Sequence, residues 1–439
     1  MDDGWRDELA EFLRIPSVSA DPTHADDVRA AGEWVCDFVR RAGGTAELAI
    51  FEEQPLALGE LRASTGAESA PTVLVYGHFD VQPPAPLELW ESEPFELAIR
   101  DGWAYARGIA DDKGQLYLLL RSAADLAAEG ALPVNVRLAC DGEEEVGGET
   151  IVHYLADDHG PADACVIFDG GFLRRGLPAF EIATRGLVVV EFTVTTGARD
   201  LHSGLYGGAA LNAANVLVDA LAAVLSRNGR VPDGLREGVV PPSPEELAAW
   251  RELPPGEQEL TEQGARPLDP RAAEEFYVRT WAEPSLDVVG ILGGKPGIRN
   301  TTISAKASAE FTIRLAPGQD VETIGSAAER LLREALPEGA ELDLSFDGAP
   351  PGQTRPEEPA VQLGLEAFER ALGVRPVLVR TGGTVPIVPA LANRGVPTIL
   401  TGFSLRESNI HSPNERLPVE HFPQGIAAAR ELYASLGRL

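Results

Sequence analysis

The sequence predicts an α/β protein into which a smaller α+β unit is inserted. Helix-like and strand-like segments alternate between residues 4 and 168, and this pattern breaks at residue 186 and resumes after the proline-rich stretch 349–359. Such alternation is typical of a sheet flanked by helices. At 439 residues the chain also exceeds the size at which one hydrophobic core stops growing, so two domains are expected.

The first part of the chain supplies most elements of the α/β domain. Residues 25–42 have apolar positions at helical spacing, and Gly43-Gly44 then ends the helix. By the same reasoning we expect further helices at 4–13, 114–130 and 149–157, and strands at 46–51, 73–76, 134–140 and 164–168. Ligand sites of such sheets lie beyond the carboxyl ends of strands, which is where we expect the acidic segments of this sequence.

The inserted unit has the pattern of a ferredoxin-like fold. We expect strands at 187–196, 286–292, 301–315 and 341–346, and helices at 209–227 and 320–336. The stretch 228–284 is rich in Pro, Glu and Ala and should hold short helices, but the sequence does not indicate its role. A helix at 360–372 and a strand at 376–379 return to the first pattern. The predicted domains are therefore 1–186 with 353–439, and 187–352.

The composition excludes several classes of partner. The formal charge is −31, so nucleic acid and anionic membrane surfaces would repel the chain, although the excess acid need not concern the substrate. No stretch approaches the length of apolar residues that spans a membrane, and the N-terminus does not resemble a signal peptide. The three cysteines are widely spaced and flanked by apolar residues. They are expected to be buried thiols of a cytoplasmic protein.

Five short segments carry the chemistry of this sequence: YGHFDVQPP, RGIADDKG, DGEEEVGG, IFDGG and NIHSPNE. Their carboxylates and imidazoles are the ligands that hard to borderline divalent ions prefer, and two such ions need about this many. The candidate residues are His78, Asp80, Asp111, Glu144, Glu145, Asp169 and His411.

Two of these segments have an ordinary structural alternative when taken alone. His78 and Asp80 lie on the same side of an extended strand end. The imidazole can ligate a metal while the carboxylate orients the ring, or both can simply be solvated. Asp111 and Asp112 precede a helix, so they fit an acidic N-terminal cap as well as a carboxylate that bridges two ions.

The triplet Glu143, Glu144 and Glu145 is harder to explain without a cation. Adjacent carboxylates after a buried strand repel one another strongly. One of them is expected to ligate a metal, and another to act as the general base beside the metal-bound water. Asp169 follows a strand and His411 lies in a polar loop, and neither is decisive alone.

Taken together, the segments resemble the dinuclear zinc peptidase family that includes carnosinase and other cytosolic dipeptidases, glutamate carboxypeptidase, aminoacylase and succinyl-diaminopimelate desuccinylase. The resemblance covers nearly the whole chain in order, and DLHSGLYGG at 200–208 places it nearest the dipeptidase branch. It implies a phosphorylase/hydrolase-like catalytic domain with a mixed sheet flanked by helices, and a ferredoxin-like lid and dimerisation domain. The implied cofactors are two divalent ions, Zn²⁺ foremost and Mn²⁺ or Co²⁺ as alternatives.

The resemblance also implies a role for each residue of the metal site. His78 and Asp169 would hold one zinc, and Glu145 and His411 the other. Asp111 would bridge both ions and be joined to Asp112 by a peptide bond that is cis in the family. Asp80 would orient the ring of His78, and Glu144 would be the general base.

The inserted unit would supply the residues that bind substrate. His202 resembles the histidine that the family's partner subunit places on the scissile carbonyl, although a capping role before a helix is the alternative and the sequence does not decide between cis and trans. Arg314 resembles the residue that holds the substrate's terminal carboxylate. Further substrate contacts are implied for Asn300, Thr301, Gly383 and Thr384, the last standing where relatives often carry serine.

These features predict an enzyme that hydrolyses dipeptides or short peptides with a free C-terminal carboxylate. A water between two zinc ions would attack the peptide carbonyl while Glu144 moves the proton, and the protein would be a homodimer through the inserted unit. A deacylase or desuccinylase acting on N-acyl amino acids is the alternative within the same chemistry. A non-catalytic metal-binding protein is disfavoured, because it would need no base beside its metals.

Overall fold

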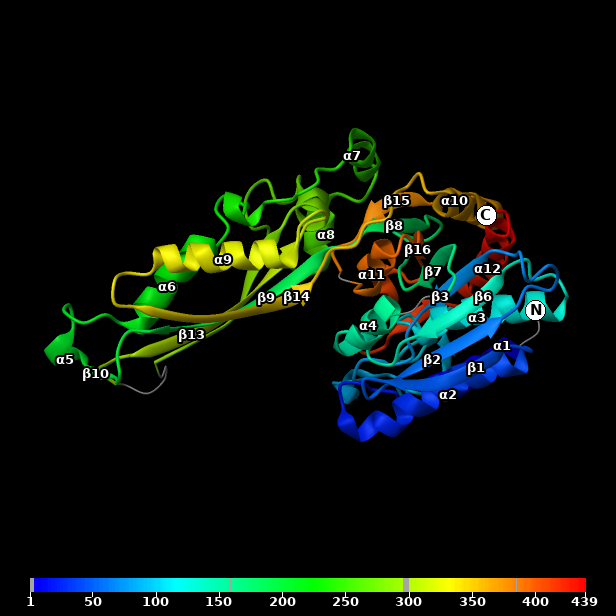
Figure 1. Cartoon of the computed structure of the whole chain (residues 1–439), viewed down its shortest axis with the longest axis horizontal. Coiled ribbons are helices and arrows are strands. Elements are labelled where there is room, and N and C mark those ends of the chain that lie inside the picture. The colour runs from blue at the N-terminus through cyan, green and yellow to red at the C-terminus, as the bar shows by residue number, and fades with distance from the viewer. Residues whose placement is uncertain (1–3, 158–159, 295–299, 384) are drawn as a thin grey trace. The chain divides into compact units, whose positions relative to one another are not determined.

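The computed structural model describes residues 4–157, 160–294, 300–383 and 385–439, and Figure 1 traces the chain through them. The chain divides into two compact units. The first comprises Met1–Ile182, Thr354–Val379 and Pro386–Leu439, and the second comprises Ala183–Gln353 with Arg380–Val385. Among the helices of the described residues, none has both the length and the apolar character needed to cross a bilayer.

A mixed sheet forms the centre of the first unit. Its described strands are β1 (Thr45–Phe51), β2 (Gln54–Leu61), β3 (Thr72–Tyr76), β6 (Asn135–Cys140), β7 (Ala164–Phe168), β8 (Ala179–Ala183), β15 (Val377–Arg380) and β16 (Thr398–Thr401). They are ordered β1-β2-β6-β3-β7-β16-β8-β15. β3 is parallel to β6 and β7, and β16 is parallel to β7, whereas β2 is antiparallel to β6. The mixed α/β architecture predicted from the sequence is confirmed.

Helices flank this sheet. The first five in chain order coincide closely with the predicted helices, whereas the last two were not predicted. The helices are α1 (Gly4–Leu13), α2 (Ala25–Arg41), α3 (Lys113–Ala128), α4 (Glu149–Asp157), α10 (Pro359–Leu372), α11 (Ile387–Asn393) and α12 (His421–Leu436). α2 packs against β1 and β2, while α12 packs against both α3 and α10. β3 and β7 are buried along their whole length, as expected for parallel strands covered on both faces.

A small antiparallel sheet completes the first unit. It is ordered β17-β5-β4 and consists of β4 (Ala98–Arg100), β5 (Trp103–Tyr105) and β17 (Arg416–Pro418). The sequence prediction missed these three-residue strands, the short strands β8 and β16, and also β2, which contains Pro55 and Gly59. Short strands and strands interrupted by Pro or Gly lack the periodic pattern on which the prediction depended.

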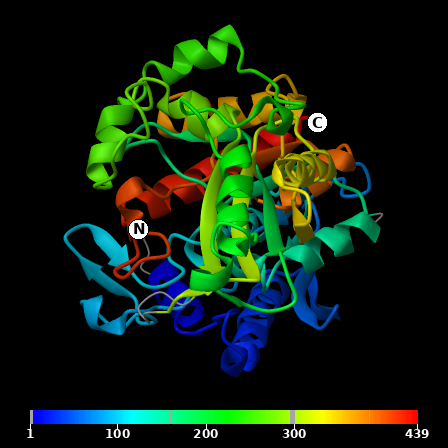
Figure 2. The ribbon, with the colours of Figure 1, turned by 90° about the vertical axis from the view of Figure 1, so that its left-hand side faces the viewer.

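The second unit is built on an antiparallel sheet with the strand order β11-β13-β9-β14. The strands are β9 (Gly186–Thr195), β11 (Ser285–Gly293), β13 (Lys306–Leu315) and β14 (Glu341–Ala349), with α6 (Ala213–Val224) after β9 and α9 (Val321–Ala335) after β13. Figures 1 and 2 show both helices on one face of the sheet, in agreement with their contacts to β9. This succession and strand order match the ferredoxin-like pattern expected from the sequence.

Alternating burial explains how this sheet holds its helices. Ala307, Ala309, Phe311 and Ile313 of β13 are buried on the helix side, while the residues between them are partly exposed. Full burial of a side chain such as Phe311 stabilises the unit by roughly 1.5–3 kcal/mol. The buried face therefore fixes the register of β13 and places Arg314 on the opposite face.

Two predicted boundaries in this unit were wrong. The helix expected at 209–227 begins at Ala213, because the Asn212 side chain accepts a hydrogen bond from Ala214 N at 3.0 Å and caps it. The strand expected at 301–315 is divided into β12 (Thr302–Ile303) and β13. β12 pairs with β10 (Leu201–His202), which precedes the short helix α5 (Ser203–Tyr206). The stretch 228–284 contains α7 (Pro244–Trp250) and α8 (Gly256–Glu262), as expected.

Candidate metal centre

Three neighbouring parallel strands deliver most of the candidate ligands of the first unit. His78 and Asp80 follow β3, Glu144 and Glu145 follow β6, and Asp169 follows β7. The pairing of β3 with β6 continues past the strand ends, because Phe79 N donates to Asp141 O at 2.9 Å and Asp141 N donates to Gly77 O at 3.0 Å. Neighbouring parallel strands end at the same edge, so these side chains are brought together.

Asp111 reaches the same place by a different route. It lies in the loop between β5 and α3, directly before the helix, so the expectation that every acidic segment follows a strand of the central sheet was wrong for this residue. The Asp111–Asp112 peptide bond is cis, as the resemblance implied.

Glu415, which no pattern in the sequence marks as functional, holds the loop that carries Asp111. Its buried carboxylate accepts hydrogen bonds from the backbone N–H groups of Gly108, Ala110 and Asp111 at 2.9, 2.8 and 3.1 Å, and from Arg107 Nη1 at 2.7 Å. Its only signal in the sequence is its place at the end of NIHSPNE. One carboxylate from the C-terminal part of the chain thus fixes the backbone that precedes the candidate bridging ligand.

The two carboxylate oxygens of Asp111 face different histidines. Oδ1 lies 3.0 Å from His78 Nε2, and Oδ2 lies 2.9 Å from His411 Nε2. His411 Nε2 also lies 3.0 Å from Glu145 Oε2. Two groups of possible ligands result, His78 with Asp111 and Asp169, and Asp111 with Glu145 and His411, and within each group the ligand atoms lie within 4.8 Å of one another. Asp111 belongs to both groups.

Asp80 contacts one residue of each of the two ligand groups. Its Oδ1 lies 3.3 Å from His78 Nδ1, the ring nitrogen that points away from Asp111. Its Oδ2 accepts a hydrogen bond from Glu145 N at 3.1 Å. Asp80 and His78 are both completely buried. A carboxylate in this position orients an imidazole and selects the tautomer whose Nε2 is free to ligate.

The backbone of His78 is held by the side chain of Asp112. Asp112 Oδ2 accepts a hydrogen bond from His78 N at 3.2 Å. A Cβ atom at Gly77 would lie 2.7 Å from the same oxygen, so only glycine allows this contact. Gly77 is therefore part of the geometry that holds His78.

The electrostatics of the centre fit divalent cations. Burial raises the pKa of Asp169 above its ordinary value, and the neighbouring Asp111 and Asp112 raise it further. Burial alone would lower the pKa of His78, but its hydrogen bonds with Asp111 and Asp80 outweigh burial and raise it. Buried carboxylates that crowd one another in this way are stabilised in their ionised form by positive charge. The donor set of imidazoles and carboxylates suits zinc and similar ions, so the residues present fit two metals.

Glu144 lies beside this centre at the start of a single 3₁₀ turn, Glu144–Val146. Burial raises the pKa of Glu144 to about 7, with further contributions from the carboxylates of Asp111 and Glu145, while His78 opposes the shift. A carboxylate with a pKa near neutrality can both accept and return a proton. The structure gives it no ligand position in either of the two groups.

In the second unit, His202 lies next to the Asn300–Thr301 segment. His202 pairs with Thr302 in the short ladder of β10 and β12, and Ser203 N donates to Thr301 O at 2.8 Å. The His202 side chain also caps α5, because its Nδ1 accepts a hydrogen bond from Gly204 N at 3.0 Å. Since this bond involves Nδ1, capping fixes the ring without using Nε2.

The remaining predicted substrate residues also belong to the second unit. Arg314 lies on β13, on the face opposite the helices, and Gly383 O accepts a hydrogen bond from Arg185 N at 3.0 Å. Thr384 lies outside the described residues. Arg185 directly precedes β9, and the sequence did not single it out. Its Nη2 donates to Ser285 Oγ at 2.7 Å.

In this chain a carboxylate is shared between two ligand groups beside an α/β sheet. This arrangement is characteristic of the class of dinuclear metallohydrolases. The family model of Peptidase family M20/M25/M40 matches residues 74–435, and the chain belongs to this family. It is therefore a hydrolase of peptide bonds, and the family resemblance drawn from the sequence is confirmed.

Individual relatives agree with this assignment. The chain is 28% identical to a cysteinylglycine-S-conjugate dipeptidase of Corynebacterium striatum, over 98% of this chain and 95% of the relative. It is also 28% identical to the Cys-Gly metallodipeptidase dug1 of Schizosaccharomyces pombe, over 95% and 92% of the two chains. Among solved structures, an M20 family metallo-carboxypeptidase of Sulfolobus solfataricus superposes with a TM-score of 0.87 at 25% identity, with 100% of both chains covered.

Proposed function

We propose that this protein is a dinuclear metal-dependent dipeptidase that hydrolyses dipeptides or short peptides with a free C-terminal carboxylate. The observation that carries the proposal is the position of Asp111, whose two oxygens lie 3.0 Å from His78 Nε2 and 2.9 Å from His411 Nε2. A carboxylate between two imidazoles is suited to serve one ion with each oxygen. The names of the relatives, which include dipeptidases acting on Cys-Gly and β-Ala-His, favour a dipeptide substrate.

We assign the ligands by group. His78 and Asp169 would hold one ion, Glu145 and His411 the other, and Asp111 both, with Asp80 orienting His78. When bound, two divalent ions supply Lewis acidity and lower the pKa of water toward roughly 7. Zn²⁺ is the proposed ion because the ligand atoms are imidazole nitrogens and carboxylate oxygens, and Mn²⁺ and Co²⁺ accept the same donors.

Glu144 is the proposed general base. Its carboxylate takes a proton from the water that attacks the peptide carbonyl, and it then returns the proton to the leaving amine. The partly buried position of Glu144 and its exclusion from both ligand groups support this role. Because the residue must be ionised before attack and protonated before the amine leaves, a pKa near neutrality suits both steps.

We further propose that the second unit binds the substrate. Arg314 offers a bidentate guanidinium for the terminal carboxylate, and His202 offers an imidazole for the developing oxyanion. Asn300, Thr301 and Gly383 are proposed as further contacts, and Thr384 is carried over from the family resemblance alone.

A homodimer through the second unit is proposed from its exposed apolar strand. β11 is an edge strand of its sheet, and Val289, Ile291 and Leu292 are 60%, 60% and 73% exposed. Val218 on the adjoining helix α6 is 59% exposed. An exposed apolar edge of this kind is usually covered by another chain. We also infer a cytoplasmic location, because Cys36, Cys140 and Cys165 are buried free thiols.

The decisive test compares Glu144→Gln with the wild-type enzyme on a panel of dipeptides, N-acyl amino acids and N-succinyl amino acids, each assayed with zinc, manganese and cobalt. The variant should bind two metal ions by elemental analysis and lose hydrolysis by at least about 100-fold. Retained turnover in the variant would remove Glu144 from the mechanism. Turnover of the acyl substrates without turnover of dipeptides would assign the enzyme to the deacylases instead.

A further inference from the structure

Arg185 is a buried cation of the second unit, and the proposed mechanism gives it no part. It directly precedes β9, and only 5% of its surface is exposed. Its Nη1 donates to Thr280 O at 2.8 Å and to Arg279 O at 3.3 Å, and its Nη2 donates to Ser285 Oγ at 2.7 Å. Burial of a charge is unfavourable unless hydrogen bonds stabilise it, and these contacts do so. The guanidinium is therefore held in one place.

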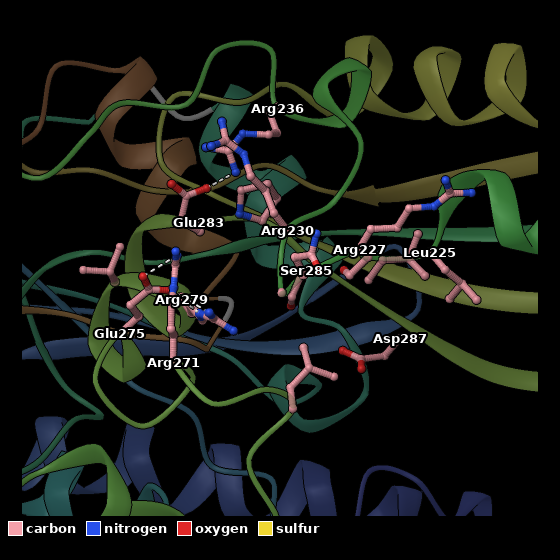
Figure 3. Close-up of a pocket in the computed structure, with 17 residues that line it drawn as sticks. Leu225, Arg227, Arg230, Arg236, Arg271, Glu275, Arg279, Glu283, Ser285 and Asp287 are labelled. Atoms are coloured by element: carbon pink, nitrogen blue, oxygen red, sulfur yellow. Dashed lines mark hydrogen bonds and ion pairs between the residues drawn. The ribbon is translucent and has the colours of Figure 1, made fainter.

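The segment that accepts these hydrogen bonds is itself restrained. The turn around Arg279 is π-helical, and the guanidinium of Arg279 lies 2.6 Å from Asp269 Oδ2 and 2.6 Å from Glu275 Oε2. Figure 3 shows the ion pair of Arg279 with Glu275 and, a few residues farther along the chain, Ser285. Charge-assisted contacts of this kind fix the backbone of the turn, so the carbonyl groups that face Arg185 keep their positions.

The hydrogen bond to Ser285 places the Arg185 guanidinium on the sheet face that carries Arg314. Ser285 is the first residue of β11 and is paired with Arg314 of β13, which is paired on its other side with Leu187 of β9. Residues paired directly across antiparallel strands project to the same face, with Cβ atoms about 4.5–5.5 Å apart. The acceptor of Arg185 is therefore the immediate neighbour of Arg314.

Arg314 acts electrostatically on Arg185. Burial is the largest cause that lowers the pKa of Arg185 to about 10, and the positive charge of Arg314 is the next largest. Asp287, two residues after Ser285 on β11, opposes this shift by a smaller amount. Two like charges repel each other, and a carboxylate bound by one of them relieves the repulsion. Each guanidinium therefore makes the surroundings of the other more favourable for an anion.

The backbone of Arg185 also contacts a proposed substrate-binding segment. Arg185 N donates to Gly383 O at 3.0 Å, and Thr381 N donates to Ala183 O at 2.8 Å. These hydrogen bonds align residues 381–383 with the chain that leads into β9. Since they involve only the main chain, they persist when the side chain of Arg185 is exchanged. A substitution at this position therefore tests the side chain alone.

We propose that Arg185 is a positioning residue for the terminal carboxylate of the substrate. The inference rests on the proposed function, in which Arg314 binds that carboxylate. Arg185 acts through Arg314, because its own guanidinium is buried and bonded to protein oxygens. Its fixed charge strengthens the attraction on the carboxylate, and its hydrogen bond to Ser285 holds the strand beside Arg314. Both effects are equal in the bound substrate and in the transition state, so they change KM and leave kcat unaltered.

The test measures kcat and KM of the full-length, metal-loaded enzyme with the best substrate of a dipeptide panel that includes Cys-Gly and β-Ala-His. Arg185→Met removes the charge at similar side-chain length, and it should raise KM at least about fivefold while kcat stays within about twofold. Arg185→Lys keeps the charge and should return KM to within about threefold of the wild type. Arg333→Met is the matched control and should change neither constant, since this arginine is exposed on α9 and pairs with Glu329.

Ser285→Ala separates the position of the guanidinium from its charge. It removes one acceptor of Arg185 and leaves the charge in place, so it should raise KM about twofold with little change in the melting temperature. Circular dichroism verifies that each variant is folded. If Arg185→Met is unfolded, Ser285→Ala decides, and an unchanged KM in that variant overturns the inference.

The remaining outcomes separate this inference from the proposed function. A KM of folded Arg185→Met equal to that of the wild type overturns the inference and leaves the proposed function intact. A fall in kcat that Arg185→Lys does not restore also overturns it, because Arg185 is then a structural residue only. If the wild type hydrolyses none of the dipeptides, the proposed function fails, and the inference fails with it.

Discussion

Replacement of Glu415 by Gln should weaken the metal centre without touching a metal ligand. Gln has the shape of Glu, but it presents an NH₂ group where one carboxylate oxygen now accepts hydrogen bonds. Glu415 Oε2 accepts from Arg107 Nη1 and Gly108 N, and Oε1 accepts from Ala110 N and Asp111 N. In either orientation of the amide, its NH₂ group faces two of these N–H donors and cannot accept their hydrogen bonds.

The magnitude follows from burial. Arg107 is 1% exposed, and once Glu415 loses its charge the guanidinium keeps a hydrogen bond of 3.3 Å to Pro83 O but has no carboxylate partner among the described residues. Breaking a buried ion pair by removing one partner costs about 3–5 kcal/mol. Loss of a residue that supports a metal ligand typically lowers metal affinity by about 10- to 100-fold. We therefore expect a lower melting temperature together with weaker metal binding.

The assay is competition of each protein with a chromogenic zinc chelator, combined with thermal unfolding. Glu407→Gln is the matched control, because Glu407 is an exposed glutamate of the same C-terminal segment. In the double variant Arg107→Met/Glu415→Gln the unpaired buried charge is gone, so stability should recover in part while metal affinity remains low. Zinc affinity of Glu415→Gln within about twofold of the control would refute the proposed support of Asp111.

Four further expectations can be measured. His411→Ala should lower the metal content to fewer than two ions per chain, and unchanged stoichiometry would contradict the ligand assignment. Removal of the metal from the wild-type protein with a chelator should lower the melting temperature, because the carboxylates then repel one another. Gly77→Ala should cost about 1–3 kcal/mol, because its Cβ would lie 2.7 Å from Asp112 Oδ2, whereas Gly197→Ala meets no atom within 4 Å and should be neutral. Burial lowers the pKa of His421, so below about pH 6.5 the unfolded chain binds more protons at this residue than the folded chain does. The free energy of unfolding should therefore fall on acidification through this range. The melting temperature of His421→Gln should depend less on pH than that of the wild type.

The sequence predicted the fold class of the chain and most of the long elements of both units. Long periodic segments such as α2 and α3 were located to within about two residues, in line with the usual uncertainty of element ends. β2 and the short strands β4, β5, β8, β16 and β17 were missed because a short or glycine-containing strand carries no readable period. The helices α11 and α12 were not predicted either. The start of α6 was misplaced because the apolar pattern begins before Asn212. The helix itself begins after Asn212, because the side chain of this residue caps it.

The metal centre, like the fold, was predicted from the sequence only in part. The residue types in the five acidic and histidine-bearing segments, together with their order, are enough to indicate a pair of metals. Their spacing in the sequence does not reveal that Asp111 comes from a loop beside the central sheet, nor that its two oxygens face two different histidines. Local pattern predicts which side chains can ligate, but it carries no information on which atoms meet.

By itself, then, the sequence determined the kind of chemistry and the architecture, because both depend on residue type and on local periodicity. Only the tertiary structure decided that Glu415 holds the backbone of Asp111, a contact between residues 304 positions apart. It alone decided that the Arg185 guanidinium lies on the sheet face of Arg314, since Ser285 bonds to the first and pairs with the second. Contacts at such distances depend on the packing of whole elements, whose relative placement no local segment encodes.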